Sequence, residues 1–244
     1  MRDLGAHLSL SGVGASSTLS ARTRGAALAL DKIRLLPVKH ETKITLVRGK
    51  AYAMGLYGVE ATALNVSNGT MLRSKAANAM VGKHQSMRSP EAVLALADKR
   101  GLDVQSEVMW RRIRLLRRAW HTRPAWRSIM EQCLGAVCRI LGWTAGGPAY
   151  DTGGGEHDEG TQLASGSKTR RAPVLRKGPI GLLAASILGI GGKLRECFIL
   201  EVPGEVPLDL LKDPIQWLRG RLFRLSAAAS MRVLAAKRAS FGHQ

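Results

Sequence analysis

The chain has 244 residues and a formal net charge of +19 at pH 7, from 37 basic and 18 acidic side chains. Its hydrophobic content of 45% is ordinary for a globular protein, and its length allows one large domain or two small ones. An excess of positive charge this large costs self-repulsion and is most simply explained by a polyanionic partner. The alternative is compositional drift in a genome rich in Ala, Gly and Arg codons.

The cysteines and the apolar segments argue against a secreted or membrane-spanning protein. Cys133, Cys138 and Cys197 make no even set for a disulfide framework, so we expect thiols in a reducing compartment. The N-terminus lacks a secretory signal, and the longest apolar run, residues 180–192, is too short to cross a bilayer. We therefore expect an intracellular protein, in the nucleus or the cytoplasm.

The first elements are a short strand and two helices. Residues 4–10 are a strand candidate, and Ser16 or Ser17 is expected to cap a helix that runs to residue 36. A second helix is predicted over residues 41–57, with one packed stripe of Ile44, Val47, Ala51 and Met54. Gly58 is expected to end it in a left-handed conformation, and Gly55 to allow close approach by a neighbouring element. Glu60 is expected to pair with an arginine or to face water.

A third helix is predicted over residues 61–81, and Ser89-Pro90-Glu91 marks the start of another. The next helix, residues 104–121, has an apolar stripe of Met109, Ile113, Leu116 and Trp120. At about 100° per residue, its opposite face carries Arg111, Arg114 and Arg118. Arginine forks bind phosphate well, so this face is a candidate phosphate-binding surface. The alternative is a charged helix face that only contacts water.

The rest of the chain predicts one more helix, a linker and a small C-terminal part. A helix over residues 124–141 ends at Gly142 and has an apolar stripe of Trp126, Ile129, Met130, Leu134, Val137 and Leu141. Beyond the linker, residues 179–188 are helical or buried, 197–202 form a strand, and 208–239 form one broken helix or two.

We therefore predict a mainly α fold, a helical bundle with a short N-terminal strand and a smaller α(+β) C-terminal segment. The expected division is a helical domain over residues 1–143, a flexible Gly-rich linker over 144–178, and a small segment over 179–244.

No motif in the sequence predicts catalysis, a metal site or a cofactor. The segment Gly189-Ile190-Gly191-Gly192-Lys193 fails as a phosphate loop, because Ile187 stands where glycine is needed and Leu194 where Ser or Thr is needed. The six histidines show no metal-ligand spacing with each other or with cysteine. We therefore expect no catalytic residue, no metal and no cofactor.

Several segments, in this order, resemble the region after the palm of a non-LTR (LINE-type) retrotransposon reverse transcriptase. Residues 3–8, DLGAHL, resemble its YLGxxL strand, and residues 55–60, GLYGVE, resemble the LYGxE element of its thumb. Residues 88–91, RSPE, and the arginine-rich helix after them are similar to the connection that follows the thumb. The likeness covers residues 2 to about 140, and residues 178–243 only weakly. Asp3 departs from the family, which has an aromatic residue before Leu-Gly, and the YxDD palm motif is absent.

By this resemblance the chain is a non-catalytic fragment whose thumb grips an RNA–DNA template–primer by backbone phosphate contacts. The implied nucleic-acid-binding residues are Arg111, Arg114 and Arg118, followed by Lys43, Arg48 and Lys50. Trp110 and Trp120 are candidates for base stacking or, alternatively, for the core. Two other hypotheses stay open: a retroelement remnant or helical interaction module without a nucleic-acid function, and a protein that binds anionic membrane surfaces.

Overall fold

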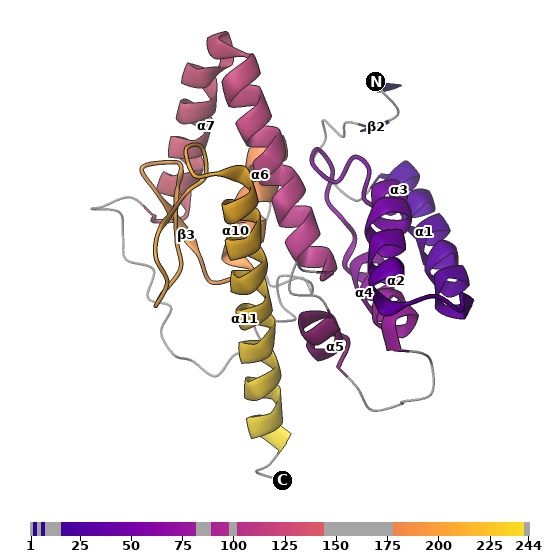
Figure 1. Ribbon diagram of the computed structural model, residues 1–244. Helices are drawn as coiled ribbons and strands as arrows, with labels where there is room; N and C mark the ends of the chain where they lie inside the picture. Colours follow the sequence, from indigo (N-terminus) through magenta and orange to yellow (C-terminus); the bar gives the residue numbers. More distant parts are fainter. Residues whose placement is uncertain are drawn as a thin grey trace.

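The computed structural model describes residues 2–3, 6–7, 16–81, 89–97, 102–143 and 178–241. Helices make up most of this described part of the chain (Figure 1). The helices are α1 Ser17–Leu35, α2 His40–Leu46, the π-helical η1 Val47–Tyr52, α3 Ala53–Gly55, α4 Val66–Val81, α5 Pro90–Ala97, α6 Val104–Thr122, the 3-10 turn η2 Pro124–Trp126, α7 Arg127–Ile140, α10 Gly178–Leu188 and α11 Ile215–Phe241. The strands are β1 Arg2–Asp3, β2 Ala6–His7, β3 Lys193–Arg195, β4 Ile199–Glu201 and β5 Leu208–Asp209. The predicted mainly α fold class is confirmed.

The N-terminal strand prediction falls partly outside the described residues. Within them, β1 and β2 pair as an antiparallel ribbon, with Arg2 opposite His7. The cap of α1 is confirmed, because the Ser16 hydroxyl accepts a hydrogen bond of 3.1 Å from the Leu19 amide. The close approach at Gly55 is also confirmed, since a Cβ on this residue would lie 2.5 Å from the Ala26 Cβ of α1.

The helix predicted over residues 41–57 forms, but a π-helical segment interrupts it. The wider π turn includes an additional residue and therefore rotates everything after it relative to an ideal α-helix. As a result Tyr52, and not Met54, completes the buried stripe that begins with Val47 and Ala51. The Tyr52 hydroxyl donates a hydrogen bond of 2.6 Å to the Leu102 carbonyl, which anchors this helix to the start of α6.

The third helix starts five residues later than predicted, at Val66. Residues before it form a turn in which the amides of Ala61 and Thr62 donate to the Gly58 carbonyl, and Gly58 has a φ of 90°, as expected of a left-handed terminator. The Asn65 side chain then accepts a hydrogen bond from the Ser67 amide at 3.0 Å. This local bond explains where α4 begins.

Two hydrophobic cores share α6. The first turn of α6 packs with α1, η1, α4 and α5, whereas the rest of α6 packs with α7, α10, the sheet and α11. In Figure 1 the helices α1–α4 lie on one side of α6, and α7 and the strands β3–β5 lie on the other. Buried residues from both sides of the expected 144–178 linker therefore belong to one core.

The C-terminal part contains an antiparallel sheet in the order β3-β4-β5 and one long helix. The strand expected over residues 197–202 is confirmed as β4, but the expected helix start at residue 208 is wrong. Residues 208–209 form β5, and the Asp209 carboxylate accepts hydrogen bonds from the Leu211 and Lys212 amides to hold a turn. α11 then runs unbroken over 27 residues. Across the ranges described above, no helix combines the length and apolar character that a membrane span requires.

Candidate nucleic-acid interface

The five arginines of α6 differ in what their guanidinium groups contact. Three of them donate hydrogen bonds to backbone carbonyls of other elements, and two are exposed. The helix is therefore both the structural centre of the molecule and the source of its candidate phosphate-binding side chains.

Arg111 points into the molecule. Its Nη1 and Nη2 atoms donate to the carbonyls of Leu56 and Tyr52 at 3.2 and 3.1 Å, and its Nε donates to Glu107 at 2.9 Å. The guanidinium thus adds hydrogen bonds to two carbonyls on either side of α3, which also accept from the Leu56 and Val59 amides. Its side chain is only 18% exposed, so the expected outward orientation is wrong for this residue.

Arg112 is buried between the two halves of the molecule. Its Nε donates to the Val59 carbonyl at 3.2 Å, and its Nη1 donates to the Leu182 carbonyl and the Ser186 hydroxyl of α10 at 2.8 and 2.6 Å. Burial lowers the pKa of Arg112 to about 10, although the charge of Glu60 opposes the change. The charge of Glu60 therefore acts on Arg112 through space, and the Glu60 carboxylate accepts a hydrogen bond from the Gly58 amide.

Arg117 connects α6 to the end of the sheet, where its Nη1 donates to the carbonyls of Leu210 and Asp213 at 3.1 and 2.7 Å. The signal that could have identified the inward contacts of Arg112 and Arg117 is their position on the flanks of the apolar stripe. A flank residue with a long apolar stem can place its guanidinium at the ends of neighbouring elements.

Arg114 and Arg118 are the exposed arginines of α6. They lie one helical turn apart, about 6 Å along the axis, and continue the line that Arg111 begins. Within the described ranges, neither forms an ion pair or a hydrogen bond through its guanidinium. Both groups therefore keep all their donors for an external anion.

The three cations expected on the second helix have different environments. Lys43 is half-buried, and its Nζ donates to the Arg34 carbonyl at 3.1 Å, which caps the end of α1. Arg48 is half-buried in η1, whereas Lys50 is exposed there. Of these three side chains, Lys50 has the accessibility that a phosphate contact requires.

The hairpin of α6 and α7 projects beyond the rest of the molecule, at the top of Figure 1. Trp126 and Ile129, which were expected to pack, lie near its tip and are 55% and 59% exposed. The apolar stripe of α7 becomes buried only from Met130 onward. Trp110 is buried, and Trp120 is half-buried with its ring edge-to-face against Phe198 at 4.7 Å, so both belong to the core.

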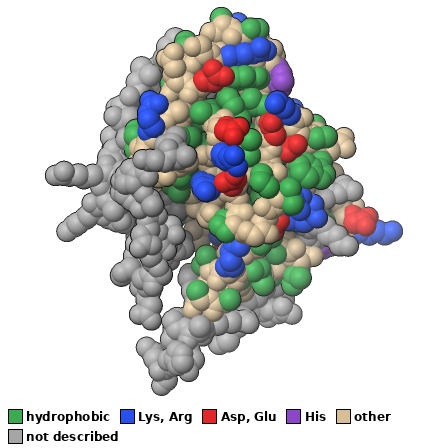
Figure 2. All heavy atoms as spheres, turned by 90° about the vertical axis from the view of Figure 1, so that its left-hand side faces the viewer, with side chains coloured by type: hydrophobic (Ala, Val, Ile, Leu, Met, Phe, Trp, Pro, Cys, Tyr) green, Lys and Arg blue, Asp and Glu red, His purple; other side chains and the backbone are tan. Residues whose placement is uncertain are grey.

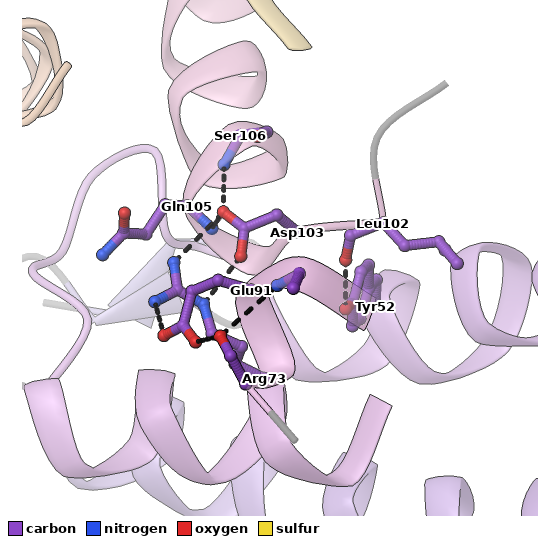
Figure 3. A network of polar contacts seen from close by, with 9 residues as sticks. Tyr52, Arg73, Glu91, Leu102, Asp103, Gln105 and Ser106 are labelled. Carbon is purple, nitrogen blue, oxygen red and sulfur yellow. Dashed lines mark hydrogen bonds and ion pairs between the residues drawn. The ribbon is translucent and has the colours of Figure 1, made fainter. Parts of the chain in front are cut away.

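A second polar cluster joins α4, α5 and α6, and it is fully paired internally (Figure 3). Arg73 donates to both oxygens of Asp103 at 2.7 and 3.2 Å and to Glu91 at 3.1 Å, while Asp103 also caps α6 by accepting from the Gln105 amide. Burial alone would raise the pKa of Glu91. The pKa is nevertheless held below 4.5, because the carboxylate accepts hydrogen bonds from Ser89 and from its own amide and lies beside the charge of Arg73.

This cluster lies at the edge of a cavity of about 480 Å³ between α5, the start of α6 and α11. The two carboxylates at its wall, Glu91 and Asp103, are already bound by Arg73. Among the residues that the structure describes, no group of three His, Cys, Asp or Glu side chains could hold a metal ion. The cluster is therefore a structural connection between three helices.

The face formed by α7 and the sheet carries mixed charge. Figure 2 shows red and blue side chains interspersed there. Glu201 pairs with Lys193 at 3.3 Å and with Arg195 at 3.5 Å, and Arg195 also pairs with Glu196 at 3.4 Å. Lys193 and Arg195 are therefore already matched by carboxylates, which distinguishes them from Arg114 and Arg118.

No family model, no curated protein and no solved structure matches this chain. The resemblance to a reverse transcriptase thumb therefore stays a prediction that rests on the quoted residues alone.

Proposed function

We propose that the protein binds the sugar-phosphate backbone of nucleic acid through the outward face of α6, with Arg114 and Arg118 as the phosphate contacts. The observation that carries the proposal is the difference between these two residues and the other arginines of the helix. Arg111, Arg112 and Arg117 have carbonyl acceptors inside the molecule, whereas Arg114 and Arg118 have none among the described residues.

The local charge supports the same conclusion. From residue 114 to residue 140 the hairpin contains six arginines and one acidic residue, Glu131. Such an imbalance raises the local potential and attracts a polyanion. Because arginine forks bind phosphate oxygens in a bidentate manner, two of them one turn apart suit a chain of phosphates better than a single small anion.

The resemblance to the thumb of LINE-type reverse transcriptases specifies this proposal further. On this reading the chain is a non-catalytic part of such an enzyme, its ligand is an RNA–DNA template–primer duplex, and its contacts fix position without reading sequence. Arg111 keeps a role that differs from the expected one, because it stabilises the Leu56 turn that resembles the LYGxE element. Lys50 is another exposed cation on the thumb-like helices.

The proposal is tested by the affinity of the full chain for a fluorescently labelled RNA–DNA hybrid. The double variant Arg114→Ala/Arg118→Ala should weaken binding by about tenfold or more, since it removes two charge-assisted contacts. The matched control is Lys193→Ala/Arg195→Ala, which removes the same charge from the sheet face and should change affinity much less.

Equal weakening by the two double variants would contradict the assigned site. Binding no stronger than that of any equally cationic protein would favour the remnant or interaction-module hypothesis. A preference for anionic vesicles over the hybrid would instead favour a membrane-surface protein.

A further inference from the structure

The tip of the α6–α7 hairpin presents an aromatic ring to solvent. Trp126 ends the 3-10 turn η2, is 55% exposed, and is followed one turn later by the exposed Ile129. Figure 1 shows that this hairpin projects from the rest of the molecule. Burying an indole ring is strongly favourable, so a ligand that covers the Trp126 ring gains a large contribution to its binding free energy.

The backbone that carries this ring is held in place. The Arg123 amide donates to the Ala119 carbonyl at 2.9 Å, and the Trp126 amide donates to the Arg123 carbonyl at 2.9 Å. Pro124 fixes a further backbone torsion, and Arg127 Nε donates to the Trp120 carbonyl at 3.0 Å. Little backbone conformational entropy therefore remains to be lost when a ligand covers the ring.

A cationic side chain lies beside the Trp126 ring. The guanidinium carbon of Arg123 lies 5.9 Å from the Trp126 ring centroid. Within the described ranges, Arg123 has no acidic partner, so its charge is available to an anion beside the ring. Trp217 offers a close comparison: it is 44% exposed and has Arg221 at 5.9 Å, but Arg221 is paired with Glu205 at 2.9 Å.

We propose that Trp126 is a stacking platform for an unpaired nucleotide, with Arg123 binding the adjacent phosphate, so that the protein prefers nucleic acid with a single-stranded segment. This inference rests on the proposed function and extends it from backbone binding to a choice between strand forms. Flat bases stack on aromatic rings in a sequence-tolerant manner, and a cation beside the ring adds phosphate contact.

The arrangement of the cations favours a nucleic-acid strand over a lipid surface. A membrane attracts cations that lie near one plane, and this attraction decays within about a Debye length, roughly 8–10 Å. Arg118 and Arg114 instead continue along α6 away from the tip, so that Arg114 lies about 12 Å along the axis from the end of the helix at Thr122. A line of this kind suits an extended polyanion.

The test compares an oligothymidylate with a blunt duplex of the same length, both bound to the full chain. Trp126→Ala should weaken oligothymidylate binding by about 5- to 150-fold, which corresponds to about 1–3 kcal/mol for the loss of one stacked base, and should leave duplex binding unchanged. Trp126→Phe should restore most of the loss because a phenyl ring also stacks. Trp217→Ala is the matched control and should change neither affinity.

A second readout follows the ring itself. Binding of oligothymidylate should quench part of the tryptophan fluorescence, and that part should be missing in Trp126→Phe. If Trp126→Ala binds oligothymidylate as the unchanged protein does, the inference is wrong even where duplex binding depends on Arg114 and Arg118. If Trp126→Ala loses binding to vesicles of phosphatidylserine and phosphatidylcholine while keeping oligothymidylate binding, the tip is a lipid contact and the inference is also wrong.

Discussion

Replacing Arg112 with methionine should destabilise the protein strongly, although the residue lies on the same helix as the exposed Arg114 and Arg118. The substitution keeps an unbranched apolar stem of similar length and removes only the guanidinium. Without it, the buried Val59 carbonyl loses its hydrogen bond from Arg112 Nε, and α10 loses its bonds from Arg112 at Leu182 and Ser186.

The size of the effect follows from two opposing contributions. Three hydrogen bonds from a charged donor contribute about 1.5–3 kcal/mol each, or about 5–9 kcal/mol together. Holding the charged guanidinium in a buried site opposes them, and the lowering of its pKa to about 10 corresponds to about 3 kcal/mol. We therefore expect Arg112→Met to lower the free energy of unfolding by about 2–6 kcal/mol, a large part of the 5–15 kcal/mol typical of a domain.

Urea denaturation followed by far-ultraviolet circular dichroism would measure this change. Arg114→Met is the matched control, because it makes the same chemical change on an exposed position of the same helix and should alter stability by about 0.5 kcal/mol or less. Equal unfolding free energies for the two variants would refute the reasoning that Arg112 joins the two cores.

Two further predictions concern packing and pH. Gly55→Ala should lower the free energy of unfolding by about 1–3 kcal/mol in a thermal melt, because its Cβ would lie 2.5 Å from that of Ala26. Gly49→Ala, with open space around it, should be neutral or stabilising, and equal effects of the two changes would argue against the close approach of the helices. The folded-state pKa of Glu91 is lowered, so the contribution of its carboxylate to stability is complete above pH 4.5 and is lost as the pH falls through the folded-state pKa. Glu91→Gln should therefore be less stable than the unchanged protein near pH 7 and equally stable at low pH. A constant difference in stability across this pH range would contradict the ion pair with Arg73.

The helix boundaries were predictable where one residue type determines them. Ser16 at the start of α1, Ser89-Pro90 at the start of α5 and Gly142 after α7 each act through local backbone chemistry that the sequence carries. The π-helical turn at residues 47–52 carries no comparable signal. It places Tyr52 on the inner face through its bond to Leu102, a residue 50 positions away along the chain.

The candidate site was predictable only in part, since helical periodicity separates an apolar face from a polar one but does not say what the polar face meets. Arg111 and Arg114 lie on the same predicted face, yet the first meets carbonyls of the Leu56 turn and the second meets water. Periodicity likewise places Trp126 on the apolar stripe of its helix but gives no information on where the packed body ends. Both differences depend on contacts between segments far apart in sequence.

The central claim is that Arg114 and Arg118 each contact a phosphate of the bound nucleic acid. The most direct test is the slope of the logarithm of the binding constant against the logarithm of salt concentration, because each neutralised phosphate contributes about 0.9 to it on duplex DNA. The account predicts that Arg114→Ala/Arg118→Ala makes the slope shallower by about 2, while Lys193→Ala/Arg195→Ala leaves it unchanged. An unchanged slope in the first variant, or an equal change in both, would contradict the claim.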